Sequence, residues 1–166
     1  MNRILILGCC VAGLAGCANV MDRLGPERAG RVASPAAAPA APAKLAPATA
    51  APPPPPAANT ADALDTTTPE QRAAATQPSA GGGRSLGTTV VTLGSATEPG
   101  LWIKTPLVQA EAQGRVTNPA TGQSSAVTLI PKAGEATAGS QMSLAALRLI
   151  GASLTDLTTV EVSLDG

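Results

Sequence analysis

A segment rich in alanine and proline constrains this chain more than any other feature. Between Ala33 and Ala58 nearly every residue is Ala or Pro, including the run Pro52 to Pro56, and Lys44 is the only charge. Each proline inside a helix removes an amide donor and clashes with the preceding turn, at a cost of about 3 kcal/mol. We therefore expect extended polyproline II that reaches up to roughly 80 Å, with few charges to orient a proline-binding partner.

The next segment, Asn59 to Ser79, is rich in Thr, Ala and Asp. Pro69-Glu70 could start a short helix through Ala75, but no apolar stripe gives that helix a surface to pack against, so we expect disorder. Three consecutive glycines follow at 81 to 83, and they lose too much backbone entropy on ordering to lie inside an element. The sequence therefore predicts one disordered linker over residues 17–84.

The first sixteen residues have the three parts of an export signal: a charged start at Arg3, an apolar run from Ile4, and small residues at its end. The run has about thirteen residues, fewer than the roughly 20 that cross a bilayer as a helix. It ends in Leu14-Ala15-Gly16-Cys17, which resembles the lipobox of bacterial lipoproteins. The resemblance implies that residues 1–16 are removed as a signal peptide and that Cys17 carries acyl chains such as palmitate.

Two alternatives to this lipobox are open. An ordinary cleaved signal or a buried N-terminal helix would need no cysteine after Leu-Ala-Gly. Cys9 also follows small and apolar residues, but a cut there leaves an apolar run of only about five residues. In the lipoprotein class, Asp after the cysteine is typical of inner-membrane retention, and here Ala18 follows. The resemblance therefore implies a lipid anchor in the outer membrane, on its periplasmic face.

From about Ser85 the sequence changes to short β-type runs separated by turn residues. The run from Gln123 to Ile130 is apolar on both faces near its end, so we expect it in the middle of the core. Ser140 to Ile150 has apolar residues at helical spacing, with Ser140 as the N-cap and Gly151 as the stop. Strands are expected at 88–93, 101–104, 114–118, 123–130 and 160–164. Residues 85–166 are thus predicted to form a mainly β domain, a small β-barrel of five strands and one helix.

Three stretches then point to a family: Arg115 to Ser124, Ser143 to Ala146, and Val160 to Val162. Their order resembles the second half of the RlpA-like double-psi β-barrel, over roughly Pro99 to Leu164. Catalytic members of that family cleave peptidoglycan glycan strands and carry an Asn-Asp-Arg-Gly-Pro segment and an earlier histidine. This chain has Leu129 to Gly134 at that place and no histidine at all. The resemblance therefore implies a degenerate, non-catalytic member.

Two enzyme alternatives stay open. One is a divergent peptidoglycan lytic transglycosylase, in which Glu135 would replace the missing acid, although one loop carboxylate is more often simply solvated. The other is a sugar-acid dehydratase, because the tail also resembles short bacterial lipoproteins labelled D-galactarate dehydratase. The sequence has no His, and its three Cys residues are Cys9, Cys10 and Cys17, so we expect no metal and no cofactor. Zero net charge and the lack of a basic stripe argue against a nucleic-acid partner.

Trp102, Arg115 and Asn118 are the candidates for a ligand groove. Trp102 is the only aromatic residue, and it would either stack on a sugar ring or cap the barrel core. Arg115 and Asn118 would line a glycan groove, or serve as a solvated face residue and a turn residue. The function expected from the sequence is a non-catalytic, membrane-anchored lipoprotein whose barrel binds the cell wall or an envelope protein.

Overall fold

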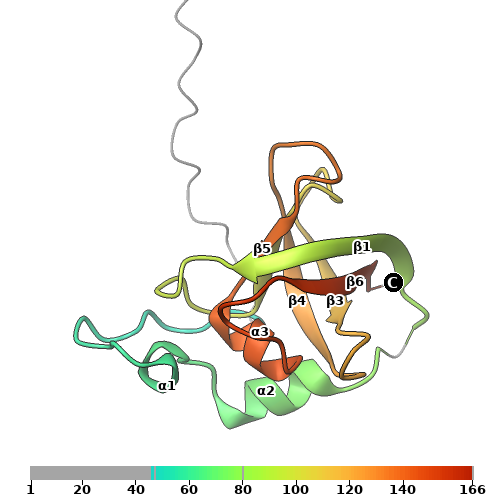
Figure 1. Ribbon diagram of the computed structural model, residues 1–166. Helices are drawn as coiled ribbons and strands as arrows, with labels where there is room; N and C mark the ends of the chain where they lie inside the picture. Colours follow the sequence, from blue (N-terminus) through green and yellow to red (C-terminus); the bar gives the residue numbers. More distant parts are fainter. Residues whose placement is uncertain (1–45, 47, 80, 166) are drawn as a thin grey trace, which may run out of the picture. The chain divides into compact units, whose positions relative to one another are not determined.

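Apolar side chains at alternate positions of the C-terminal strands meet inside a closed six-stranded β-barrel (Figure 1). The structure is a computed structural model that describes residues 46, 48–79 and 81–165. The predicted signal peptide, Cys17 and the first part of the predicted linker lie outside the described residues. The strands are β1 Arg84–Leu93, β2 Trp102–Thr105, β3 Ala112–Thr117, β4 Ser124–Pro131, β5 Ser140–Met142 and β6 Thr158–Leu164. The prediction of a mainly β barrel is confirmed.

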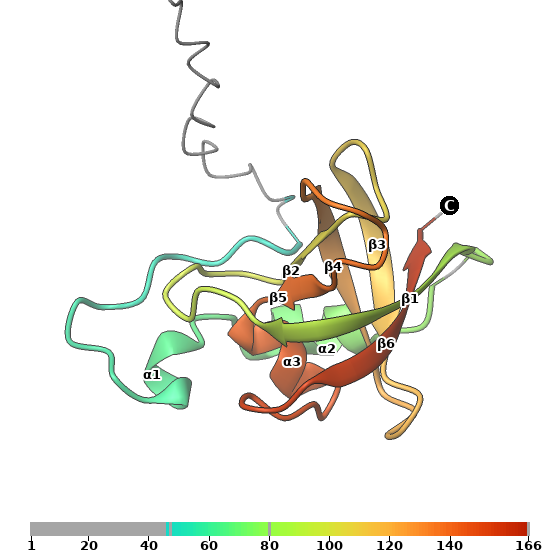
Figure 2. The ribbon, with the colours of Figure 1, turned by 45° about the horizontal axis from the view of Figure 1, so that its top comes forward.

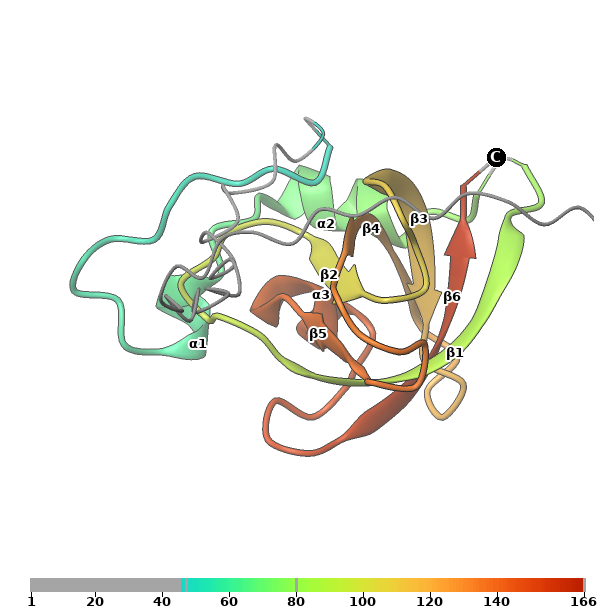
Figure 3. The same cartoon turned by 90° about the horizontal axis from the view of Figure 1, so that it is seen from above.

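The strand order around the barrel is β1-β5-β2-β4-β3-β6. The β1–β5 and β2–β4 pairs are parallel, whereas the other neighbours are antiparallel. β1 and β6 run side by side in Figures 2 and 3 and close the barrel, with pairs from Arg84–Leu164 to Val91–Thr158. β4 pairs with β2 and β3, and Val127, Thr128 and Leu129 in succession are buried, so both of its faces are covered, as expected.

Aliphatic side chains from all six strands fill the barrel interior. Burying each one contributes about 1.5–3 kcal/mol relative to leaving it in water. The helix α3, Leu144–Leu149, adds Ala146 and Leu147 to the same core. The interior residues of the strands are 0–1% exposed and comprise Val91, Ile103, Val116, Val127, Leu129, Met142, Val160 and Val162.

The predicted helix from Ser140 to Ile150 is wrong in its first turn. Ser140 is not an N-cap but the first residue of β5, where its hydroxyl bonds those of Thr89 and Thr105, each at 2.9 Å. The N-cap is Ser143, which accepts a hydrogen bond from the Ala146 N–H. A three-residue strand is too short to show a period of two, so only its pairing with β1 and β2 reveals it. Gly151 does end the helix, with a φ of 62° that favours glycine.

The prediction of disorder from Asn59 to Ser79 is also wrong. This region contains α1, Ala61–Leu64, and α2, Pro69–Thr76, and α2 packs against β4. Thr68 forms a capping box with Gln71, and Pro69 occupies the first helical position, so the local sequence favours the start of α2. We call residues 48–79 the strap, because this segment precedes the barrel and lies on its outer surface. Among the described residues, no helix has the length and apolar character needed to span a membrane.

Gly114 offers a test of the barrel packing, because β3 passes very close to β6 there. A Cβ at Gly114 would collide with the Ser163 carbonyl oxygen and lie 2.9 Å from Leu129 Cγ. We expect Gly114→Ala to lower the free energy of unfolding by about 1–3 kcal/mol, as overpacked cores do. Urea unfolding followed by the fluorescence of Trp102 measures this change. The control is Gly81→Ala, where a Cβ meets nothing within 4 Å, and equal stability of the two variants would contradict the packing.

Candidate functional site

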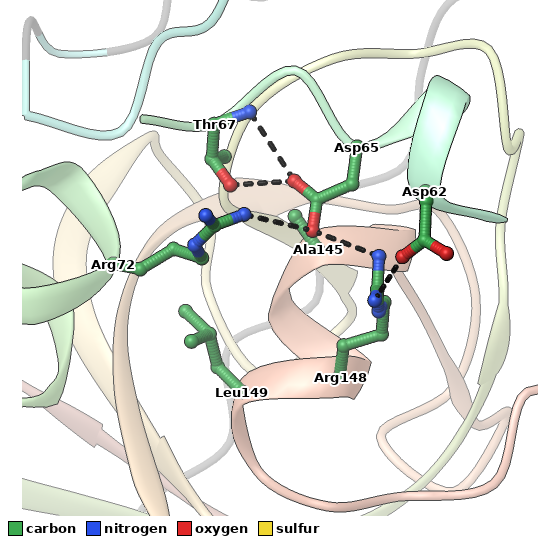
Figure 4. Close-up of a pocket in the computed structure, with 7 residues that line it drawn as sticks. All are labelled: Asp62, Asp65, Thr67, Arg72, Ala145, Arg148 and Leu149. Carbon is green, nitrogen blue, oxygen red and sulfur yellow. Dashed lines mark hydrogen bonds and ion pairs between the residues drawn. The ribbon is translucent and has the colours of Figure 1, made fainter. Parts of the chain in front are cut away.

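A pocket lies where the strap meets α3. Its volume is about 600 Å³, within the usual range for small-molecule pockets, and Figure 4 shows its walls. Two aspartates and two arginines dominate the lining, so its character is charged rather than apolar. The lining residues are Asp62, Asp65, Thr67, Arg72, Ala145, Arg148 and Leu149.

Asp65 is the centre of this pocket. Its side chain is only 3% exposed, although it carries a charge. One carboxylate oxygen accepts hydrogen bonds from the Thr67 N–H at 3.2 Å and the Thr67 hydroxyl at 2.5 Å. The other oxygen faces Arg148 at 3.3 Å and Arg72 at 3.7 Å. A buried carboxylate persists only when it is paired and hydrogen-bonded, and Asp65 meets both conditions.

Arg148 connects the barrel to the strap. It lies in the last turn of α3 and pairs with Asp62 at 2.5 Å as well as with Asp65. It also donates to the Ala61 carbonyl at 3.3 Å. The Asp62 side chain is 86% exposed, so this pair is screened by water and contributes little, whereas Asp65 is shielded.

The charges of the pocket neutralise one another. Both arginines already face Asp65, and Arg148 also binds Asp62. Every fully buried side-chain N or O atom among the described residues has a hydrogen-bond partner, so none is aimed at a missing ligand. The arrangement is suited to holding the strap on the barrel rather than to acid–base chemistry.

Arg115 forms a second attachment for the strap, at the end of α2. Its guanidinium donates to the Ala75 carbonyl at 3.2 Å and to the Gln77 carbonyl at 2.5 Å. It also reaches the hydroxyls of Ser79 and Ser124. These contacts satisfy carbonyls that the end of a helix leaves without intrahelical partners. Arg115 is therefore neither a free groove residue nor a solvated one.

Thr49 forms the third attachment, near the start of the described chain. Its hydroxyl lies 2.6 Å from that of Thr128 on β4, and its carbonyl accepts from the Leu101 N–H at 2.8 Å. Thr49 is 3% exposed and Thr128 is fully buried. The strap is thus fastened at both ends and at the pocket between them.

Glu70, in the first turn of α2, has a pKa below its ordinary value of 4.5. Its own backbone N–H is the largest cause, and the Thr68 hydroxyl adds to it. A lowered folded-state pKa stabilises the folded chain above the ordinary pKa, and the contribution is lost as the pH falls through the lowered value. The start of α2 is therefore weakened by acid.

The structure does not bring Trp102 and Asn118 together with Arg115 in a groove. Trp102 is fully buried, its indole N–H donates to the Glu98 carbonyl at 3.4 Å, and Lys104 Nζ lies 4.5 Å from the ring centroid. A ring covered in this way cannot stack on a sugar, and the ring is buried on the face of β2 opposite to the interior residue Ile103. Asn118 is also buried, and its amide donates to the Ile150 carbonyl at 3.0 Å, which ties the 118–122 turn to the end of α3.

Glu135, the acid of the transglycosylase alternative, is exposed in the loop between β4 and β5. The described residues contain no group of three His, Cys, Asp or Glu side chains that could hold a metal ion. A single exposed glutamate is not the paired, partly shielded acid and base that glycoside hydrolysis requires.

Sequence reasoning missed the pocket, although one signal of it was visible. The sequence indicates a possible helix start at Pro69-Glu70, and the lack of an apolar stripe argues against it. The capping box of Thr68 with Gln71 is the local signal that favours α2 all the same. Nothing local indicated that Arg148 would meet Asp62 and Asp65, which are more than eighty positions earlier in the chain.

We compared the chain with protein-family models, curated proteins and solved structures, and no match was found.

The pocket makes a testable prediction about the strap. Asp65→Asn keeps the shape of the side chain but removes its charge beside Arg72 and Arg148. We expect faster amide hydrogen exchange in α1 and α2, and a loss of about 1–3 kcal/mol of stability, because the charge-assisted hydrogen bonds of the buried Asp65 carboxylate are lost.

The matched control is Asp62→Asn, which removes an exposed partner of the same Arg148. An exposed pair contributes about 0–1 kcal/mol, so exchange in α2 should stay close to that of the unaltered chain. If the Asp62 variant loosened the strap as much as the Asp65 variant, the central role of Asp65 would be refuted.

Proposed function

We propose that the chain is a lipid-anchored envelope protein whose barrel is a non-catalytic module that binds the cell wall or another envelope protein. The proposal combines the lipobox-like Leu14-Ala15-Gly16-Cys17 with the way in which the strap is attached to the barrel. Its anchor is Cys17, in the outer membrane and facing the periplasm.

The attachment of the strap at Thr49 is the observation that carries this proposal. A lipid at Cys17 would pull on the chain, and the first described residue to resist that pull through buried contacts is Thr49. The stretch between Cys17 and this attachment has 31 residues, from Ala18 to Ala48, and is shorter than the whole predicted linker. In an extended polyproline II conformation it would reach roughly 95 Å. With Cys17 in the membrane, the attachment at Thr49 would set the length of chain between the membrane and the barrel.

The position that corresponds to the catalytic acid of the RlpA-like family supports a non-catalytic barrel. That stretch here begins with Leu129, which is fully buried in the core, and continues with Lys132, whose ammonium donates to the Gly139 carbonyl at 3.1 Å. Where the catalytic members carry a carboxylate, this chain has a leucine packed in the core and a lysine bound to a loop carbonyl. The relationship to the double-psi family is part of the proposal, and the two parallel strand pairs of the barrel are compatible with it.

Lipidation at Cys17 is the first prediction of this proposal. In cells fed a clickable palmitate analogue, the unaltered protein should carry the label and sediment with outer membranes. Cys17→Ser should lose the label and appear in the soluble periplasmic fraction, because the thiol that bears the acyl chains is absent.

Cys9→Ser is the matched control for this experiment, since Cys9 ends the weaker lipobox-like stretch. It should keep the label and the membrane location. If Cys9→Ser lost the label while Cys17→Ser kept it, the anchor would be Cys9 instead of Cys17. If the unaltered chain carried no label, the proposed lipid anchor would be refuted.

The second prediction concerns catalysis. The full chain in detergent should sediment with purified insoluble peptidoglycan, or with an envelope protein cross-linked to it, and should leave the glycan strands intact in a zymogram. Clearing of the gel that Glu135→Gln abolishes, and that the exposed control Glu111→Gln leaves intact, would establish the enzyme alternative instead.

A further inference from the structure

The barrel is complete without the strap. The six strands close through pairs with one another, and the strap supplies none of these strands. Among the described residues, Ala75 is the strap's only member of the hydrophobic core. Burial of apolar surface is the dominant favourable contribution to folding, and the strap adds one methyl group to it. The strap can therefore leave the barrel without opening the core.

Hydrogen bonds inside the strap tie its extended start to its helical part. The Thr66 hydroxyl donates to the Pro52 carbonyl at 2.5 Å, and the Gln71 side-chain amide donates to the Ala50 carbonyl at 2.6 Å. The partners are 14 and 21 positions apart in the chain, and all four residues belong to the strap. The strap thus has an internal structure of its own, as expected of a segment that opens as a unit.

The buried carboxylate of Asp65 keeps most of its partners when the strap moves. Thr67 and Arg72, which bind it, belong to the strap, whereas Arg148 belongs to α3 (Figure 4). Opening separates Asp65 from Arg148 and brings water to both groups. A hydrated charge beside an arginine carries no burial penalty, so release of the strap strands no buried ion.

The barrel side chains that hold the strap also have other partners or contact with water. The Gln113 amide donates to the Thr128 hydroxyl at 3.2 Å, and Arg115 donates to the Ser124 hydroxyl at 3.1 Å. The Arg148 side chain is 37% exposed even with the strap in place. The main cost of breaking a hydrogen bond is a buried group left without a partner, and detachment of the strap avoids it at these three side chains.

A glycine segment, residues 81–83, connects the strap to β1. A Cβ at Gly81 or Gly82 would meet nothing within 4 Å, so no neighbour packs against the chain there. Glycine adopts positive and negative φ about equally readily, which lets the backbone turn at these two positions. Rotation there swings the strap about its C-terminal end and leaves β1 in place.

We propose that the strap is a releasable segment, which opens from the barrel as one body about Gly81 and Gly82 while the barrel stays closed. Opening uncovers the surface of β4 against which α2 packs. A pull on the chain before Thr49 favours the open form, because it loads the attachments one after another, from Thr49 toward the glycines. Residues 48–79 would then add roughly 100 Å of reach when extended. The opening requires no lipid anchor, so this proposal and the proposed function can fail separately.

Residue-resolved native-state hydrogen exchange on the full chain in detergent tests the opening. The Leu101 N–H is the decisive probe, because it belongs to the barrel but donates to the Thr49 carbonyl of the strap. We expect this amide and those of α2 to exchange at least tenfold faster than the amides of the β1–β6 pair. If Leu101 exchanged as slowly as the β1–β6 pair, the strap would leave only when the barrel unfolds, and the proposal would be overturned.

Two variants show whether the strap moves as one body. Arg148→Gln weakens the attachment at the pocket, and Arg115→Gln weakens the attachment at the end of α2. Each should accelerate exchange at Leu101 and in α2 by the same factor and leave the β1–β6 pair unchanged, although neither changes the Thr49 attachment itself.

The matched control is Lys132→Gln, which removes a barrel cation that binds the Gly139 carbonyl. It should leave exchange at Leu101 and in α2 as in the unaltered chain. If the arginine variants accelerated α2 alone and not Leu101, the strap would not open as one body. If they accelerated the β1–β6 pair as much as the strap, the barrel would not stay closed. Either result would refute the proposal.

Discussion

The antiparallel pairing of β1 with β6 is the interaction on which the rest of the structure depends. It joins the first and last strands of the barrel from Arg84–Leu164 to Val91–Thr158, and without it the sheet would have two free edges. Closure also brings the inward side chains of all six strands into one interior. The chain has no Phe or Tyr, so this core is made from Val, Leu, Ile, Met and Ala. Small side chains fill space only when the walls are close together, and a closed barrel provides this.

The strap supplements this small core from outside. Domains of this size bury only about 60% of their surface and are marginal on their own. Thr49, Asp65 and the end of α2 give partners to Thr128, Arg148 and Arg115, polar residues of the barrel that would otherwise face water or lack a partner. The strap and the barrel are therefore parts of one folded unit, and residues 48–79 of the predicted linker belong to the fold.

The attachment at Thr49 defines where a pull on the lipid-anchored chain would reach the barrel. A tether attached at Thr49 would transmit its pull to β4 through a buried hydroxyl pair with Thr128, and to the start of β2 through the backbone hydrogen bond with Leu101. The proline run comes directly after this point, at the outer surface of the strap. The barrel beyond the strap would then be left to contact the wall or another protein.

The alternation of Val160 and Val162 with polar neighbours was enough to predict β6, and the two apolar faces of the fourth strand were enough to predict that β4 is buried on both faces. The helix α3 was predicted because Leu144 and Leu147 repeat at its period, and Gly151 because only glycine readily takes the turn that follows. These features are local, and the residues that cause them are neighbours in the chain. The lipobox-like motif at Cys17 is local in the same way, and it stays a prediction.

Only the tertiary structure decided β5, the strap and the pocket. Ser140 to Met142 is a strand because β1 and β2 offer it hydrogen bonds on both sides, and its own three residues have no period. The strap is ordered because Arg115 and Arg148 lie where they can pair with it, across separations of about forty and eighty-five positions. Arg115, Trp102 and Asn118 were candidates for a groove because their residue types suit one, but their partners across the fold engage all three in structural contacts. A sequence determines the period and the turns of its elements, whereas the partner of a charged or polar side chain depends on which distant surface the fold places beside it.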